Sequence, residues 1–277
     1  MKKILVPIDF TDTAENAFVY ALEMAKFYNS ELLLLHTFDM PYVDNEILVF
    51  NYAEVYENLE VSNSNQFDEE LKKLYDLAKA NDAKNIRINH IMMAGNLIEN
   101  IKLAVHQENI DFVVMGTNGA SGWFDSLVGT YTSEVISDLS VPVMSVAHDA
   151  KFEKMDTIAF TTRYKEKDIL ALEEVLTIAK RINAKVKCLY VKTSDSDVSK
   201  DTLNIWESHF KNEKNLEFFI IPSDDVSQTI EEFLVNHNID LLAMVTYKRS
   251  FFANFFTTST TQKMSLHLKT PVLALHE

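Results

Sequence analysis

The chain has 277 residues, 47% of them hydrophobic and 24% charged, which is typical of a globular protein long enough for about two domains. Its 26 basic and 41 acidic residues give a net charge of −15, which argues against nucleic acid or an anionic membrane as a partner. The single cysteine, Cys188, excludes an internal disulfide, and no apolar run reaches the roughly 20 residues of a membrane-spanning helix.

The first half of the chain predicts strands that alternate with helices. Apolar runs of strand length lie at residues 3–8, 31–37, 86–92, 111–115 and 141–147. Helical spacing is found at residues 12–28, 67–80, 95–107 and from Gly129 onward, and the less regular stretch 39–66 could hold a helix at 47–59. This alternation indicates an α/β fold with a parallel, doubly wound sheet and right-handed crossovers. The first residues lack the long apolar region of a secretion signal, so we expect a cytoplasmic protein.

The second half of the sequence repeats the first. Asp111-Phe-Val-Val-Met matches Asp240-Leu-Leu-Ala-Met, and Val141-Pro-Val-Met matches Thr270-Pro-Val-Leu, both at an offset of 129 residues. Further strands are expected at residues 157–162, 186–191 and 216–221, with helices at residues 168–182 and 226–235. We therefore predict two tandem domains, residues 1–148 and 155–277, each with a five-stranded parallel sheet.

Glycine is concentrated in one stretch of the chain. Four of the five glycines lie between the strand at 111–115 and the helix that follows it: Gly116, Gly119, Gly122 and Gly129. A glycine loop before a helix N-terminus is a common phosphate site, because backbone N–H groups can approach an anion there. In the second half, at the same offset, three of these glycines are replaced by Val245, Lys248 and Thr258. The repeated scaffold therefore does not need them, and we expect a ligand to be the reason for their presence.

The spacing Gly116-x2-Gly119-x9-Gly129-Thr130 resembles the ATP-binding signature of the universal stress protein family. The opening Val6-Pro-Ile-Asp and the closing Val-Pro-Val strand are also similar to that family. The resemblance covers both halves as a tandem protein, with the nucleotide motif in the first only. It implies a Rossmann-like, adenine nucleotide alpha hydrolase-like fold with strand order 3-2-1-4-5. It also implies an intramolecular pseudo-dimer through residues 143–146 and 272–275, and leaves a further homodimer open.

Carried over by position, the resemblance assigns an adenine-nucleotide site to the first domain. Pro7, Ile8 and Asp9 would line the nucleoside pocket, with Asp9 accepting from the ribose or the adenine. Thr37 would contact adenine through its backbone, and Met115 would pack near the base. The remaining residues would surround the phosphates: Gly116, Gly119, Gly129, Thr130 and Thr132. Tyr131 lies among them and has no assigned role.

The glycine stretch has no basic residue of its own. Between Gly116 and Thr132 the only charge is Asp125, and a helix N-terminus supplies only about half a positive charge. We therefore expect ATP to bind with Mg²⁺, or ADP or AMP to be preferred. The acidic residues are also concentrated in this half, since residues 1–150 hold 23 of the 41 Asp and Glu.

Several alternatives stay open at this point. Asp9 could be a helix cap with no role in ligand binding, and the glycine loop could be a turn without a ligand. His36 is expected to be a core histidine. The Phe251-Phe-Ala-Asn-Phe-Phe cluster fits either a packed loop or a partner surface. No P-loop, hydrolase motif or metal-ligand spacing is found, and no catalytic or metal residue is assigned. We expect a nucleotide-dependent stress regulator or sensor; the alternatives are an interaction module without nucleotide and a slow ATPase.

Overall fold

The computed structural model describes residues 2–38, 52–117, 134–196, 198–246 and 270–276. Its contacts divide the chain into two compact units, Met1–Gly116 and Thr117–Glu277, which we call unit 1 and unit 2. These units do not coincide with the two repeats, and the domain boundary at residues 148–155 stays a prediction. Within the described ranges, none of the helices combines the length and apolar character needed to cross a membrane.

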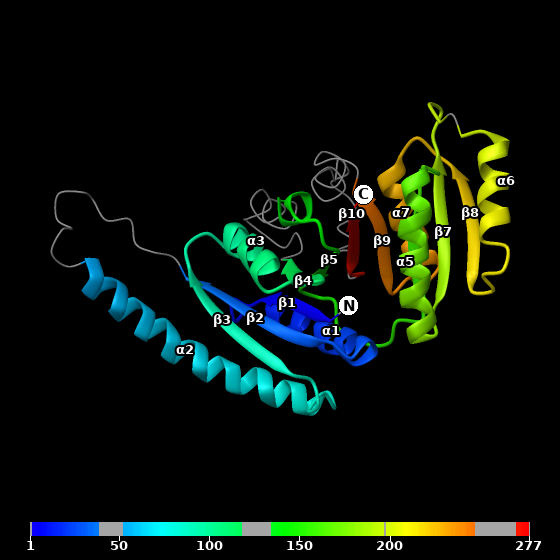
Figure 1. The fold of residues 1–277 in the computed structure, drawn as a ribbon. Helices are drawn as coiled ribbons and strands as arrows, with labels where there is room; N and C mark the ends of the chain where they lie inside the picture. Colours follow the sequence, from blue (N-terminus) through cyan, green and yellow to red (C-terminus); the bar gives the residue numbers. More distant parts are fainter. Residues whose placement is uncertain (1, 39–51, 118–133, 197, 247–269, 277) are drawn as a thin grey trace. The chain divides into compact units, whose positions relative to one another are not determined.

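Unit 1 is a parallel sheet with helices between its strands (Figure 1). In chain order its elements are β1 (Lys3–Pro7), α1 (Asp12–Tyr28), β2 (Glu31–Phe38), α2 (Tyr52–Ala80), β3 (Ile88–Ala94), α3 (Leu97–Gln107) and β4 (Phe112–Thr117). The strands lie in the order β3-β2-β1-β4, with Val6 opposite Leu34 and Leu5 opposite Val113. The apolar runs of β1, β2 and β4 are almost wholly buried, as expected where helices cover both faces of a parallel sheet.

The second helix of unit 1 differs from the prediction. The sequence analysis separated a helix at 47–59 from one at 67–80, whereas α2 is a single helix of 29 residues. Residues 60–66 are mostly polar but contain neither Gly nor Pro, so no residue in this stretch terminates the helix. Its described core face consists of side chains at helical spacing: Phe67, Leu71, Leu74 and Ala78.

Unit 2 contains the second repeat together with the last strand of the first. Its elements are β5 (Val143–Ala147), β6 (Thr157–Thr161), α5 (Glu166–Ile182), β7 (Lys185–Lys192), α6 (Lys200–His209), β8 (Leu216–Pro222), α7 (Val226–Asn236), β9 (Leu241–Thr246) and β10 (Val272–His276). The parallel strands follow the order β8-β7-β6-β9-β10, which is the predicted 3-2-1-4-5 order for the second repeat. The α/β class with a mostly parallel sheet is confirmed.

The two repeats are not separated into independent sheets of five strands. Strand β5, which belongs to the first repeat by sequence, pairs antiparallel with β10, with Met144 opposite Leu273. Both strands are buried apolar segments, and pairing them protects two sheet edges that would otherwise expose unpaired backbone groups. The prediction of two separate five-stranded sheets is therefore corrected: strands of both repeats share a sheet.

One aspartate performs the same structural task in each repeat. Asp111 Oδ2 accepts hydrogen bonds from the backbone nitrogens of Lys2 and Lys3, at 2.7 and 3.0 Å. Asp240 Oδ2 accepts from Asp156 N and Thr157 N, both at 2.8 Å. Each carboxylate thus ties the amino end of one strand to that of its neighbour, which explains why this residue matches between the halves.

Candidate functional site

The carboxyl end of β1 carries the first group of predicted site residues. Pro7 and Ile8 are buried, and the backbone nitrogen of Ile8 donates to Leu35 O of β2 at 2.8 Å. Asp9 follows directly and is exposed, so the chain leaves the sheet at this point. In the order β3-β2-β1-β4, strands β2 and β3 are added on one side of β1 and β4 on the other. The point between β1 and β4 is thus a topological switch point, where ligands bind in open α/β sheets.

The carboxylate of Asp9 shapes the turn into α1. Its Oδ1 accepts from Thr11 N at 3.1 Å and from Thr11 Oγ1 at 2.6 Å. Thr11 is in turn the N-cap of α1, where its Oγ1 accepts from Ala14 N at 3.3 Å. The N-cap of α1 is therefore Thr11 and not Asp9, whose carboxylate orders the turn just before the helix. Because both bonds use Oδ1, and a carboxylate has a second acceptor oxygen, this role is compatible with a ligand on Oδ2.

Aromatic side chains hold the same turn against β2 and α2. Phe10 has a positive φ of 63°, which is unusual for a bulky residue, and its ring lies 4.6 Å from that of His36. His36 Nδ1 is 2.9 Å from Ile8 O, and Phe67 of α2 stacks on the His36 ring at 5.4 Å. A carbonyl only accepts, so Nδ1 carries the hydrogen, in line with the core role expected of His36. The sequence alone gives no sign that Phe10 and Phe67 lie at this turn, because their contact depends on the packing of α2 against β2.

Thr37 lies near the carboxyl end of β2, where a buried amide from α3 reaches it. Asn100 is 5% exposed, and its Nδ2 lies 3.4 Å from Thr37 Oγ1 and 3.2 Å from Ala94 O of β3. Thr37 itself is half-buried. Asn100 thus links the ends of two strands at the edge of the sheet where Asp9 lies, and the sequence analysis did not single it out.

Met115 and Gly116 lie near the end of β4, next to the start of α1. Met115 is buried. A Cβ added to Gly116 would lie 2.8 Å from Thr13 Cγ2 and 2.9 Å from Thr13 O, which is closer than real Cβ contacts come. Gly116 is therefore required by the close approach of α1 to β4. This corrects the expectation that the fold has no need of this glycine: at Gly116 packing is reason enough.

The rest of the predicted phosphate loop lies outside the described residues: Gly119, Gly129, Thr130, Tyr131 and Thr132. The Phe251 cluster also lies outside them. In the part of the chain that the structure describes, no three His, Cys, Asp or Glu side chains are grouped so that they could hold a metal ion. The structure therefore brings Pro7, Ile8, Asp9, Thr37, Met115 and Gly116 to the carboxyl ends of β1, β2 and β4.

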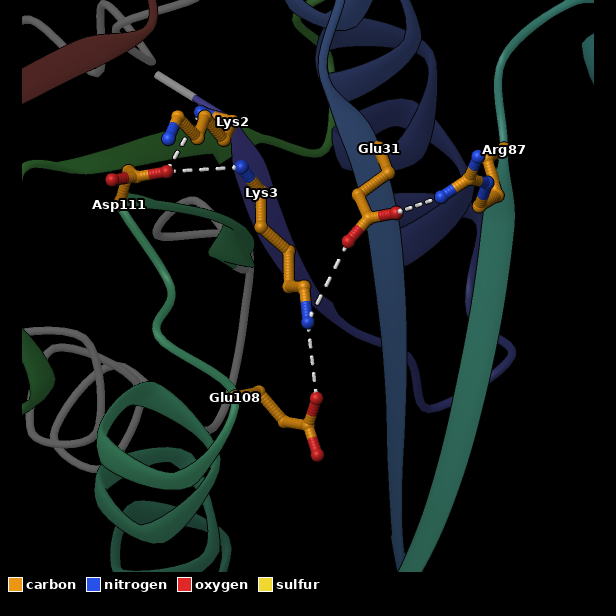
Figure 2. Close-up of polar contacts among 6 residues, drawn as sticks. All are labelled: Lys2, Lys3, Glu31, Arg87, Glu108 and Asp111. Carbon is orange, nitrogen blue, oxygen red and sulfur yellow. Dashed lines mark hydrogen bonds and ion pairs between the residues drawn. The ribbon is translucent and has the colours of Figure 1, made fainter.

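A charged network lies at the opposite, amino ends of the same strands (Figure 2). Lys3 Nζ is 3.0 Å from Glu108 Oε2 and 3.6 Å from Glu31 Oε1, and Arg87 Nη1 is 3.1 Å from Glu31 Oε2. The hydrogen bond to Glu108 raises the pKa of Lys3, against the opposing effect of burial. Since β1 begins at Lys3 and β2 at Glu31, this network joins strand starts and does not belong to the candidate site.

The second repeat fills the corresponding turn with its own side chains. Asp168 of α5 is fully buried, and its Oδ2 accepts from Thr162 Oγ1, Arg163 N and Lys165 N at 2.8, 2.8 and 3.2 Å. Tyr164, like Phe10 a residue with positive φ, packs edge-on against Tyr190 and Trp206 at 5.0 and 4.8 Å. Burial raises the pKa of Tyr164 well above its usual range. The hydrogen-bond donors of this turn are thus bonded to Asp168, and its tyrosine ring is packed against Tyr190 and Trp206.

The first half of the chain matches a known protein family. The profile of the universal stress protein family matches residues 1–147. Two curated relatives come from Methanocaldococcus jannaschii. Universal stress protein MJ0577 is 28% identical over 152 residues, 52% of this chain and 94% of the relative. Universal stress protein MJ0531 is 26% identical over 151 residues, 54% of this chain and 84% of the relative.

Solved structures extend the similarity of fold to the whole chain. A universal stress protein from Archaeoglobus fulgidus superposes with a TM-score of 0.74 at 17% identity, over 99% of this chain and 98% of the other. A protein described as a putative universal stress protein from Pseudomonas aeruginosa gives a TM-score of 0.65 at 12% identity, over 100% and 93%. At these identities the likeness concerns the fold alone.

Proposed function

The chain belongs to the universal stress protein family, and we propose that its first repeat binds an adenine nucleotide as a nucleotide-dependent stress regulator or sensor. The observation that carries the proposal is the convergence of Asp9, Thr37 and Gly116 at the carboxyl ends of β1, β2 and β4. This edge contains the switch point of the sheet, where a ligand is expected. The glycine loop predicted to hold phosphate begins at the same place, directly after β4.

The width of the sheet supports the assignment of base and phosphate to different strands. Neighbouring strands lie about 4.8 Å apart, so the end of β2 is about 10 Å from the end of β4. A nucleotide whose phosphates lie on the glycine loop would therefore reach Thr37 with its base. Asp9, on the strand between them, would accept a hydrogen bond from the ribose or the base.

We propose that the second repeat binds no nucleotide and serves as a structural partner. Arg163 stands where the first repeat has Asp9, and the turn around it is closed by Asp168 and Tyr164. The antiparallel pairing of β5 with β10 supports an intramolecular pseudo-dimer of the two repeats. The cytoplasmic location expected from the sequence stays a prediction.

The charge of the site suggests which nucleotide species it takes. The glycine stretch supplies no Lys or Arg, and Asp9 is acidic. A triphosphate would need its charge neutralised by Mg²⁺, whereas ADP or AMP would need this less. No residue is assigned as a general base, so we propose that hydrolysis, where it occurs, is slow.

Calorimetric titration with ATP, ADP and AMP, each with and without Mg²⁺, tests the proposal. Asp9→Asn keeps an acceptor oxygen for Thr11 but removes the charge, and is expected to weaken binding about tenfold or more. Arg163→Gln, at the matched position of the second repeat, should leave binding unchanged. An absence of binding at millimolar nucleotide would favour the interaction module instead. Equal effects of the two substitutions would contradict the site.

A further inference from the structure

Asn100 is a polar side chain of α3 that is almost wholly buried between the carboxyl ends of β2 and β3. Its Nδ2 lies 3.2 Å from Ala94 O, 3.5 Å from Met93 O and 3.4 Å from Thr37 Oγ1. A backbone carbonyl can only accept, so the atom beside Ala94 and Met93 must be the amide nitrogen and not the amide oxygen. The same nitrogen faces Thr37, and Asn100 therefore donates to the threonine hydroxyl.

This direction decides what the Thr37 hydroxyl can do. A hydroxyl has one hydrogen to donate, and an amide nitrogen cannot accept it. Among the described residues, Asn100 is the only hydrogen-bond partner of Thr37 Oγ1. The hydroxyl hydrogen of Thr37 is thus left for an acceptor supplied from outside these residues, and the half-buried side chain is reachable from solvent.

We propose that Asn100 holds Thr37 as a hydrogen-bond donor to a ring nitrogen of the bound base, an inference that rests on the nucleotide site proposed above. Thr37 lies two strands from β4, where the glycine loop begins, about 10 Å away. With the phosphates on that loop, the base of a nucleotide and not its phosphates would reach Thr37. The unprotonated ring nitrogens of adenine are acceptors of the kind this hydroxyl requires. Thr37 is then a specificity residue, and Asn100 is a positioning residue that acts through it.

Three variants separate the hydroxyl from the shape of the side chain. Thr37→Val removes the hydroxyl at nearly constant volume and is expected to weaken ATP binding roughly threefold to tenfold, the net worth of one hydrogen bond. Thr37→Ser keeps the hydroxyl and should bind within about twofold of the natural protein. Asn100→Ala should weaken binding as Thr37→Val does, and the double variant should bind no worse than Thr37→Val alone, because Asn100 acts only through the Thr37 hydroxyl.

Deaza analogues of ATP, in which a single ring nitrogen is replaced by CH, give a readout that a purely structural role would not move. One of the N1, N3 and N7 analogues should bind the natural protein more weakly than ATP does. That same analogue and ATP should bind Thr37→Val equally. Thermal unfolding of each variant shows whether it is folded, and if Asn100→Ala is not, the two Thr37 variants with the analogues carry the test.

The outcomes that overturn the inference are distinct from those that overturn the proposed function. If the natural protein binds ATP and Thr37→Val binds it equally tightly, the donor role is wrong and the nucleotide site stands. If the losses from Thr37→Val and Asn100→Ala simply add, Asn100 does not act through Thr37. If the natural protein binds no nucleotide at millimolar concentration, the proposed function fails, and the inference fails with it.

Discussion

Gly116→Ala is expected to destabilise unit 1 by a steric mechanism. The added Cβ would lie 2.8 Å from Thr13 Cγ2, 2.9 Å from Thr13 O and 3.0 Å from Thr13 C, against about 3.5–4.0 Å for carbon atoms in favourable contact. Thr13 is buried in the first turn of α1, so relief of the contact would shift the start of that helix. Overpacking of this kind costs about 1–3 kcal/mol, and the lower chain entropy of alanine offsets about 0.4–1 kcal/mol.

The net loss, about 1.3 kcal/mol at the midpoints of these two ranges, is measurable by equilibrium urea unfolding followed by circular dichroism. Thr13→Ser removes Cγ2, so the Gly116→Ala/Thr13→Ser double variant should regain part of the loss, while the contacts with the residue 13 backbone remain. Gly95→Ala is the matched control: Gly95 has φ of +108° and no atom within 4 Å of the added Cβ, so its cost is conformational and independent of Thr13. A Gly116→Ala protein as stable as the natural one would contradict the close contact between position 116 and Thr13.

Three further perturbations test the described contacts. Burial raises the pKa of Asp111, but the backbone N–H groups of Lys2 and Lys3 outweigh it and leave the pKa below its ordinary value of 3.8. The stabilisation of the folded state by the Asp111 carboxylate is then present at neutral pH and is lost as the pH falls through the lowered pKa. Asp111→Asn should therefore cost about 1 kcal/mol at neutral pH, a value kept small by exposure, and almost nothing in acid. Urea unfolding at both pH values measures the difference. Asp168→Ala removes the acceptor of one buried donor, Thr162 Oγ1, and of two part-buried backbone donors, and should cost about 1–3 kcal/mol in unit 2, seen as an earlier unfolding transition; an unchanged transition would contradict the hydrogen bonds described. Burial raises the pKa of the Cys188 thiol well above its ordinary value of 9.0, so a thiol reagent should label it only as fast as unit 2 opens; rapid labelling of the folded protein would show the burial to be wrong.

The sequence predicts those elements whose signal is local and continuous. The apolar runs that become β1 and β2 are buried on both faces, and a buried parallel strand needs no alternating pattern to be seen. The sequence match between Asp111 and Asp240 identifies a residue that makes the same backbone hydrogen bonds in both repeats. By contrast, no helix was assigned to residues 200–209, because in α6 only Trp206 is buried and the remaining positions give little periodicity.

The details of the candidate site that the sequence missed depend on contacts between distant residues. Gly116 needs to be glycine because Thr13, from the first helix, approaches it in space. The burial of Asn100 and its direction of donation follow from the carbonyls at the end of β3, which no local pattern encodes. The positive φ of Phe10 is set by packing against His36 and Phe67. Composition and spacing locate the strand ends, but tertiary packing decides which groups are left for a ligand.

The number of nucleotides bound per chain distinguishes a single nucleotide site in the first repeat from two sites or none. Equilibrium dialysis of the full-length protein against saturating ATP with Mg²⁺ measures this number without any assumption about mechanism. We predict one nucleotide per chain, because the turn of the second repeat is occupied by Asp168 and Tyr164. Two nucleotides per chain would contradict the closed second repeat, and none would contradict the nucleotide site itself.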